Sequence, residues 1–370
     1  MDHPYRSQPA KAYWKETVTP YHPQDVPDWY EKRFSLEGAR IATAGSCFAQ
    51  QLGRNLRESG FRYLDVEPAP EGLPVALHRD YGYALYSARY GNVYTTRQLI
   101  QLIQRALGQF TPTETHWEKD GGVVDPFRPT IEPEPYGSVA ELQVLQRDHL
   151  EHVVEMFHEQ DVFVFTMGMT EAWLSRHDGA AFPLCPGTAG GVYDDTKYRF
   201  HNLNSVEVRA DMEASIAALR AINPKLKILL TVSPVAIMAT ATDQQVAVAN
   251  AYSKSLLRTV AGELYDAHDF IDYFPSYEMI TAPFMKGYFL APTQREVAPA
   301  GVAFVMAQFM AQHQPPTAMR RAEGPAATPA PRPLPTRRAP PAPRQDAGDL
   351  ALDDVKCDEE ILAAFGPPKD

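Results

Sequence analysis

The sequence alternates between short apolar runs of strand length and longer segments of helical period. The apolar runs cover residues 41–44, 161–168, 227–235 and 270–278. Continuous apolar runs of this length are typical of parallel strands that helices cover on both faces. The segments between them carry apolar side chains at helical spacing. This order of strands and helices predicts an α/β protein with one parallel sheet between two layers of helices.

The first predicted helix and the second predicted strand are separated by an insertion of about a hundred residues, at about 62–160. A helix capped by Thr95, with Gln98 three residues later, is expected inside it. The loop after that helix is far longer than an ordinary connection, and long ordered loops are usually functional. The insertion is therefore a candidate lid over a substrate, with an extra packing layer as an equally good interpretation.

The end of the chain differs from residues 1–313, which we expect to form a single domain. Residues 315–344 are rich in proline, alanine and arginine and carry little to bury, so the region 314–370 predicts a disordered tail. Its last part regains apolar residues at helical spacing beside acidic ones. A transient helix at a frayed end is the favoured interpretation of that part. A short motif that docks a protein partner is the alternative.

Composition limits the partners and the setting. The formal net charge of −11 argues against nucleic acid as the main partner, because phosphate binding favours a basic surface. No secretory signal and no apolar run long enough to span a membrane are seen. The three cysteines are widely spaced and odd in number, so no disulfide framework is expected. These features predict a reduced, cytoplasmic setting in which Cys47 is a free thiol.

A serine and a cysteine lie side by side at the first joint between a strand and a helix, in "IATAGSCFAQQL" (41–52). An oxyanion would be stabilised at this place by the N-terminus of the helix, so Ser46 is a candidate nucleophile. An ordinary helix also begins with a capping serine, and that use is far commoner. Local physics alone therefore favours a cap, although residue 49 is alanine and lacks the side chain of a capping box.

Five blocks of sequence change this balance. They are "AGSCFAQQL" near the N-terminus, "FTMGMTEAW" (165–173), "LLTVSPVAIMAT" (229–240), "NAYSKSLLRTVAGEL" (250–264) and "DYFPSYEMI" (272–280). Together, over roughly residues 35–310, they resemble the GSCFA-domain family, which is similar to the SGNH/GDSL hydrolase superfamily. The resemblance implies a flavodoxin-like, three-layer α/β/α fold. It also implies ester hydrolysis or acyl transfer, often on carbohydrates, with no cofactor and no metal.

The resemblance assigns roles to five residues. Ser46 matches the nucleophile, with Cys47 beside it as a second candidate for that role or as an inert buried residue. Gly168 would offer a backbone donor to the oxyanion. Thr170 takes the place of an asparagine that normally donates to the same atom. Glu171 is a carboxylate at the edge of the sheet where ligands gather in α/β proteins, with capping or pairing as its alternative role.

The sequence departs from the superfamily after the last strand. The expected Asp-x-x-His reads Thr293-x-x-Glu296, and without an imidazole the serine has no obvious base. His201 is the best-placed substitute, oriented by Glu171 or Glu207, although helix capping or packing is rated slightly above catalysis for this residue. His177 is the next choice, and Glu171 or Glu296 could serve directly.

One histidine pair has the spacing of metal ligands. His149 and His152 share a predicted helix face with Glu155, but no third ligand is evident. A solvated helix face is the favoured interpretation, so no metal site is expected.

Taken together, these observations predict an esterase or O-acyltransferase that uses Ser46 on a small-molecule or glycan acyl ester. The alternative is a non-catalytic module that keeps the SGNH pocket to bind a glycan or a protein. The lost Asp-x-x-His favours binding, whereas the retained Gly-Ser-Cys joint favours catalysis.

Overall fold

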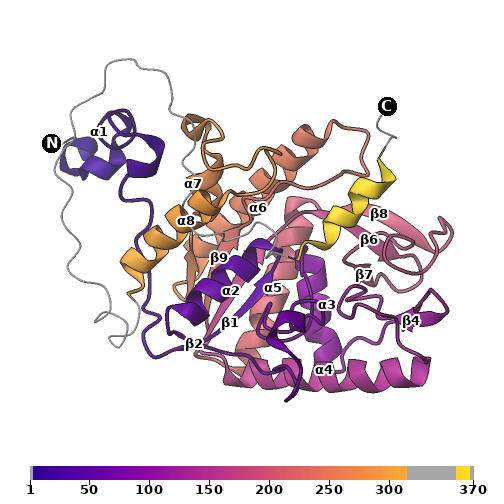
Figure 1. The fold of residues 1–370 in the computed structure, drawn as a ribbon. Helices are drawn as coiled ribbons and strands as arrows, with labels where there is room; N and C mark the ends of the chain where they lie inside the picture. The colour runs from indigo at the N-terminus through magenta and orange to yellow at the C-terminus, as the bar shows by residue number, and fades with distance from the viewer. Residues whose placement is uncertain (1–2, 315–355, 367–370) are drawn as a thin grey trace.

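The computed structural model describes residues 3–314 and 356–366, and its centre is a sheet of five parallel strands (Figure 1). The strands are β1 (Arg40–Gly45), β2 (Arg62–Tyr63), β5 (Val162–Met167), β9 (Lys227–Val232) and β10 (Ile271–Tyr273). The four strands predicted from apolar runs are confirmed as parallel neighbours. β2 was not predicted, because two residues leave no pattern.

The strand order is β10-β9-β5-β1-β2. Numbered along the chain, this is the order 2-1-3-4-5 of flavodoxin-like doubly wound sheets, in which ligands bind beside the first and third strands. Those strands are β1 and β5, and Gly45 pairs with Thr166 at their carboxyl ends. The residues that follow, Ser46 and Gly168, therefore lie at the same edge of the sheet, as predicted.

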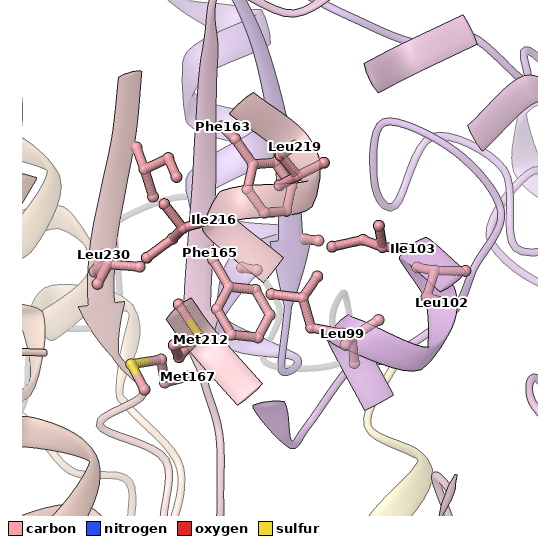
Figure 2. Close-up of a cluster of buried hydrophobic side chains, with 14 of the residues drawn as sticks. Leu99, Leu102, Ile103, Phe163, Phe165, Met167, Met212, Ile216, Leu219 and Leu230 are labelled. Atoms are coloured by element: carbon pink, nitrogen blue, oxygen red, sulfur yellow. The ribbon is translucent and has the colours of Figure 1, made fainter. Parts of the chain in front are cut away.

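Helices cover both faces of the sheet, which confirms the three-layer arrangement. One face carries α3 (Thr96–Ala106), α4 (Val139–Glu159), α5 (Ser205–Ile222) and α6 (Val246–Ala267). The other carries α2 (Phe48–Glu58), α7 (Ser276–Thr281) and α8 (Pro299–Gln312). Successive strand residues point to opposite faces. Phe163 and Phe165 thus pack among α3 and α5 (Figure 2), while Val164 packs under α2 and α8.

The insertion is mainly a packing layer, and one stretch of it reaches the sheet edge at Gly45. Its helices α3 and α4 bury apolar side chains in the core, so the packing interpretation is right for them. The long loop holds a small hairpin, β3 (Trp117–Lys119) and β4 (Gly122–Val124). Just before α3 the chain reaches the sheet edge, where Val93 N–H donates to Gly45 O at 2.9 Å.

A second, antiparallel sheet stands beyond the edge of the first one. It consists of β6 (Glu171–Ser175), β7 (Ala181–Phe182) and β8 (Tyr198–Asn202), with β6 in the middle. These strands were not predicted. His201, which was expected in a loop, lies on β8 opposite Ala172.

Short helical turns complete the described chain. They are α1 (Trp14–Thr17), η1 (Pro4–Ser7), η2 (Ala10–Ala12), η3 (Pro23–Asp25), η4 (Val75–Leu77), η5 (Pro283–Met285) and η7 (Asp358–Phe365). Within the described residues, no helix is both long enough and apolar enough to cross a membrane.

Residues 356–366, the C-terminal segment, pack against the body of the protein and carry η7, drawn in yellow in Figure 1. Cys357, Asp358 and Glu359 are buried. This differs from the expected frayed end, because polar groups of the body bind the segment, as described below. The predicted disorder of residues 315–355 lies outside the described residues.

Candidate active site

The joint between β1 and α2 requires glycine at residue 45. Gly45 has φ +139°, and a Cβ atom there would lie 2.4 Å from the carbonyl oxygen of Thr166. The next residue, Ser46, donates its N–H to that same oxygen at 3.1 Å. Gly45 thus lets the chain turn tightly against β5 and fixes the position of Ser46.

Ser46 does not cap the helix that follows. Cys47 is the N-cap residue of α2, and its side chain makes no capping hydrogen bond. The Ser46 hydroxyl is fully buried and has no hydrogen-bond partner among the described residues. The capping interpretation of Ser46 is therefore wrong. A buried hydroxyl without a partner is uncommon and suggests a functional role.

Gly168 lies directly against Ser46, since a Cβ atom on this glycine would be 3.0 Å from Ser46 Cβ. Its N–H donates to the Tyr94 carbonyl at 3.0 Å, so that donor is already used in this conformation. Thr170 is also engaged, because its hydroxyl donates to Asn202 Oδ1 at 2.6 Å. The N-terminus of α2 also lies at this joint, with the positive end of its dipole, and its Ala49 and Gln50 N–H groups donate to the carbonyls of Ser46 and Cys47 at 2.8 and 3.1 Å.

Lys254 reaches the same place from α6. Its Nζ donates to the Gly168 carbonyl at 2.6 Å, and its side chain is buried. Burial lowers the pKa of Lys254 to about 8, so a substantial fraction of the amine is neutral near physiological pH. Sequence reasoning missed this residue. The available signal was a lysine in register with the buried Leu257, Ala261 and Leu264 of α6.

Arg295 is a second cation beside the site. Its Nη2 lies 3.5 Å from Cys357 Sγ and 3.5 Å from Glu359 Oε2, both in the C-terminal segment. The adjacent Glu296 binds Arg295 at 3.2 Å and accepts a hydrogen bond from Thr293. The stretch that replaces Asp-x-x-His therefore contributes an arginine, which the sequence analysis did not consider.

The thiols of Cys47 and Cys357 border the same small cavity and lie close enough for each to shift the pKa of the other. The Cys47 thiol, with the Arg295 charge, lowers the pKa of the Cys357 thiol. Both cysteines are buried and unpaired by disulfides. Cys47 is thus covered by a residue more than three hundred positions away in the sequence.

His201 is not hydrogen-bonded to Ser46. Its Nε2 lies 2.7 Å from Glu207 Oε1, and its Nδ1 lies 3.4 Å from Arg199. The expected pairing with Glu207 is present, but the Ser46 hydroxyl is not part of it. His177, the second candidate, binds Thr113 in an exposed position.

Glu171 borders a cavity of about 600 Å³ beside the sheet edge. Its carboxylate accepts hydrogen bonds from Thr240 Oγ1 at 2.6 Å and from the Ala241 N–H at 3.1 Å. The walls are mainly apolar and include Trp173, Leu184, Glu359 and Leu362. The cavity is large enough for a small acyl ester, and the C-terminal segment forms part of its wall.

The two histidines of α4 differ, because His152 is partly exposed, as the solvated-face interpretation predicts, whereas His149 is not. His149 is buried, and its Nδ1 lies 2.7 Å from Glu67 Oε2. Burial and the neighbouring Arg128 lower the pKa of His149 to about 4. Within the described residues, no group of three or more His, Cys, Asp or Glu side chains is arranged to hold a metal ion.

Comparison with known proteins identifies the family to which this chain belongs. No curated protein and no solved structure matches the chain. The model of the GSCFA family matches residues 40–309, a range that contains Ser46, Gly168, Lys254 and Arg295. Since this match spans well over half of the sequence, the protein belongs to the GSCFA family.

Proposed function

We propose that this protein is an SGNH-type serine esterase or O-acyltransferase that uses Ser46 on an acylated, carbohydrate-like substrate. The observation that carries the proposal is the buried, unpartnered Ser46 hydroxyl at the switch point of the sheet. A cytoplasmic setting is part of the proposal, and the free thiols among the described residues support it.

Lys254 is the base in this proposal. In its neutral form the amine takes the proton of Ser46 as the hydroxyl oxygen attacks the acyl carbon, either directly or through one water molecule. The ester C–O bond then breaks, and the leaving alcohol receives the proton. Water releases the acyl group in an esterase, and an acceptor hydroxyl takes it in a transferase. Serine–lysine pairs are a known variant of the serine triad. His201 stays the alternative base.

The N-terminus of α2 would stabilise the negative charge that develops during the reaction. The attacked carbonyl oxygen becomes negative, and the positive end of the α2 dipole supplies the favourable partial charge. The apolar cavity beside Glu171 suits the acyl part of the substrate.

The second candidate function is non-catalytic binding of a glycan or a protein. It is favoured by the replacement of Asp-x-x-His and by the presence of a peptide segment over the site in this structure.

A fluorophosphonate probe, which reacts with activated serines, separates the two functions. Because Ser46 is buried, labelling is measured on the parent chain and on a Glu359→Lys chain, in which the covering segment carries a reversed charge. We expect Ser46 to be labelled, Ser46→Ala to abolish labelling and esterase activity, and Ser255→Ala, at an exposed serine of α6, to change neither. If neither chain is labelled and hydrolysis of an aryl acetate does not depend on Ser46, the binding function is supported instead.

A further inference from the structure

The C-terminal segment is bound to the candidate site by its backbone as well as its side chains. Gln50 Nε2 donates to Lys356 O at 2.8 Å, and Lys356 N–H donates to Gln50 Oε1 at 2.9 Å. Asn92 donates a further hydrogen bond to Lys356 O at 3.1 Å. This amide clamp holds the backbone of Lys356, so its hydrogen bonds do not depend on the side chain at that position.

Polar side chains of the body bind the acidic side chains of the segment. Asp358 Oδ2 accepts from Asn92 Nδ2 at 2.7 Å, and Thr130 donates to Asp358 Oδ1. Glu359 lies 3.5 Å from Arg295, and the charges of Arg295 and Lys254 oppose the burial that raises the pKa of Glu359. Two adjacent acidic residues thus have separate binding partners, although the whole protein is acidic.

The segment also covers the groups that the proposed chemistry requires. Cys357 lies beside Cys47, the neighbour of Ser46, and the Glu359 carboxylate is near enough to raise the pKa of the buried Lys254. The Ser46 hydroxyl is shut off from solvent. Because Cys47 adjoins Ser46, a segment bound beside Cys47 obstructs the approach of a substrate to Ser46.

We propose that Gln50, Asn92, Thr130 and Arg295 form a binding groove for an acidic peptide, which residues 356–365 of the same chain occupy and thereby close. The segment lies outside the residues matched by the family model. The groove does not depend on the proposed catalysis, because its ligand is recognised through amide, hydroxyl and guanidinium contacts.

The first test measures binding in trans. The probe is a fluorescent synthetic peptide with the sequence of residues 354–366, and the protein is the full chain carrying Glu359→Lys. We expect this variant to bind the peptide at least about tenfold more tightly than the parent chain, whose groove is already filled, since a reversed charge beside Arg295 expels the tethered segment. The same peptide carrying the Glu359→Lys change should not bind.

Glu360→Lys is the matched control. Glu360 is the adjacent acidic residue, but its side chain is 56% exposed and 3.9 Å from Arg295, against 8% exposed and 3.5 Å for Glu359. The control chain should therefore behave like the parent. Equal peptide binding by the parent and both variants would overturn the proposal.

The second test traps the segment through its own cysteine. Diamide accepts two electrons and two protons, so the thiols of Cys47 and Cys357 lose them and form one disulfide bond. Mass spectrometry should find Cys47 joined to Cys357 within one chain, while the half-buried Cys185 stays free, and a Cys357→Ser chain should give no such product. A Cys47–Cys357 bond only between two chains, or none, would overturn the assignment to this chain's own segment.

Failure of this proposal and failure of the proposed function are distinguishable. Peptide binding and trapping without any labelling of Ser46 would support the groove and count against the esterase. Labelling of the parent chain that is unchanged by disulfide trapping would support the esterase and show that the segment does not close the site.

Discussion

The ammonium group of Lys254 donates a 2.6 Å hydrogen bond to the carbonyl oxygen of Gly168, the glycine whose backbone packs on Ser46. This hydrogen bond fixes the buried amine of Lys254, whose pKa is lowered, beside the glycine that packs on Ser46. The Ser46 hydroxyl is also buried, and it has no partner among the described residues.

Replacing Lys254 by methionine tests whether the amine is the base. We expect Lys254→Met to slow ester hydrolysis by about a hundredfold or more, because general-base catalysis contributes that much. The parent rate should rise with pH through about 8, since only the neutral amine accepts a proton and the pKa of Lys254 is about 8. Both are measured as kcat over pH 6–10. Lys225→Met, at an exposed lysine, is the control. A Lys254→Met protein with the parent's rate and pH profile would remove the lysine from the mechanism.

Alanine at Gly45 should destabilise the fold. The new Cβ would lie 2.4 Å from a backbone oxygen, at a φ that side chains rarely adopt, so we expect a loss of about 3 kcal/mol or more. Gly38→Ala separates the cost of the steric contact from the cost of the positive φ. Gly38 has φ +69° but nothing within 4 Å of its ideal Cβ, so only the backbone cost of about 1 kcal/mol applies. Urea denaturation measures both, and equal losses would show that the contact with Thr166 is unimportant.

The pair of His149 and Glu67 should make stability depend on pH. The pKa of His149 is about 4 in the folded protein and near 6.5 when unfolded. Between these values the unfolded chain binds the additional proton, so stability falls as the pH is lowered from about 6.5 to 4, by up to about 3 kcal/mol. Burial would raise the pKa of Glu67, but the contacts with His149 and Arg128 outweigh it and lower this pKa to about 2. The stability that Glu67 contributes is therefore lost only below about pH 4.5.

Denaturant unfolding at several pH values measures this dependence. His149→Gln keeps a donor to Glu67 but does not titrate, so its stability should change less between pH 6.5 and 4. His152→Gln, one turn away on α4 and partly exposed, should keep the parent's pH dependence. Parallel curves for all three proteins would contradict the assignment to His149.

Removal of the C-terminal segment should lower the melting temperature. A disordered tail, as the sequence predicts, could be removed with almost no effect, whereas Cys357, Asp358 and Glu359 are buried in the structure. We expect a chain that ends at residue 355 to melt lower by roughly 2 °C for each kcal/mol of lost stability, because the shift per kcal/mol decreases as the domain becomes larger. Calorimetry compares it with a chain that ends at residue 366. Identical melting would show that the segment adds nothing to stability.

The sheet and its layers could be predicted because their signals are local. An apolar run such as residues 162–167 is long enough to identify a buried strand, and Thr95 with Gln98 marks the start of α3 by itself. The meeting of Ser46 with Gly168 followed from topology, since parallel strands that are neighbours end at the same edge of the sheet.

The other groups of the site could not be predicted, because they meet only through long-range packing. Lys254 comes from a distant helix, Arg295 from an irregular loop, and Cys357 from beyond a proline-rich stretch. Ser46 looked like a cap because strand-to-helix joints usually have one, and only the folded geometry reveals that its hydroxyl is unpartnered. The C-terminal segment was expected to fray because acidic residues are usually exposed to solvent. Their partners Asn92 and Arg295 come close to them only in the folded protein.

The covalent link between the body and the C-terminal segment gives that segment a local concentration that dilution cannot reduce. A tethered ligand acts at an effective concentration on the order of millimolar, however scarce the protein is. An external peptide of the same intrinsic affinity would therefore occupy half of the grooves only at about a millimolar concentration. A natural activator has to bind the groove far more tightly than the segment does, or else weaken the segment's own hold on it.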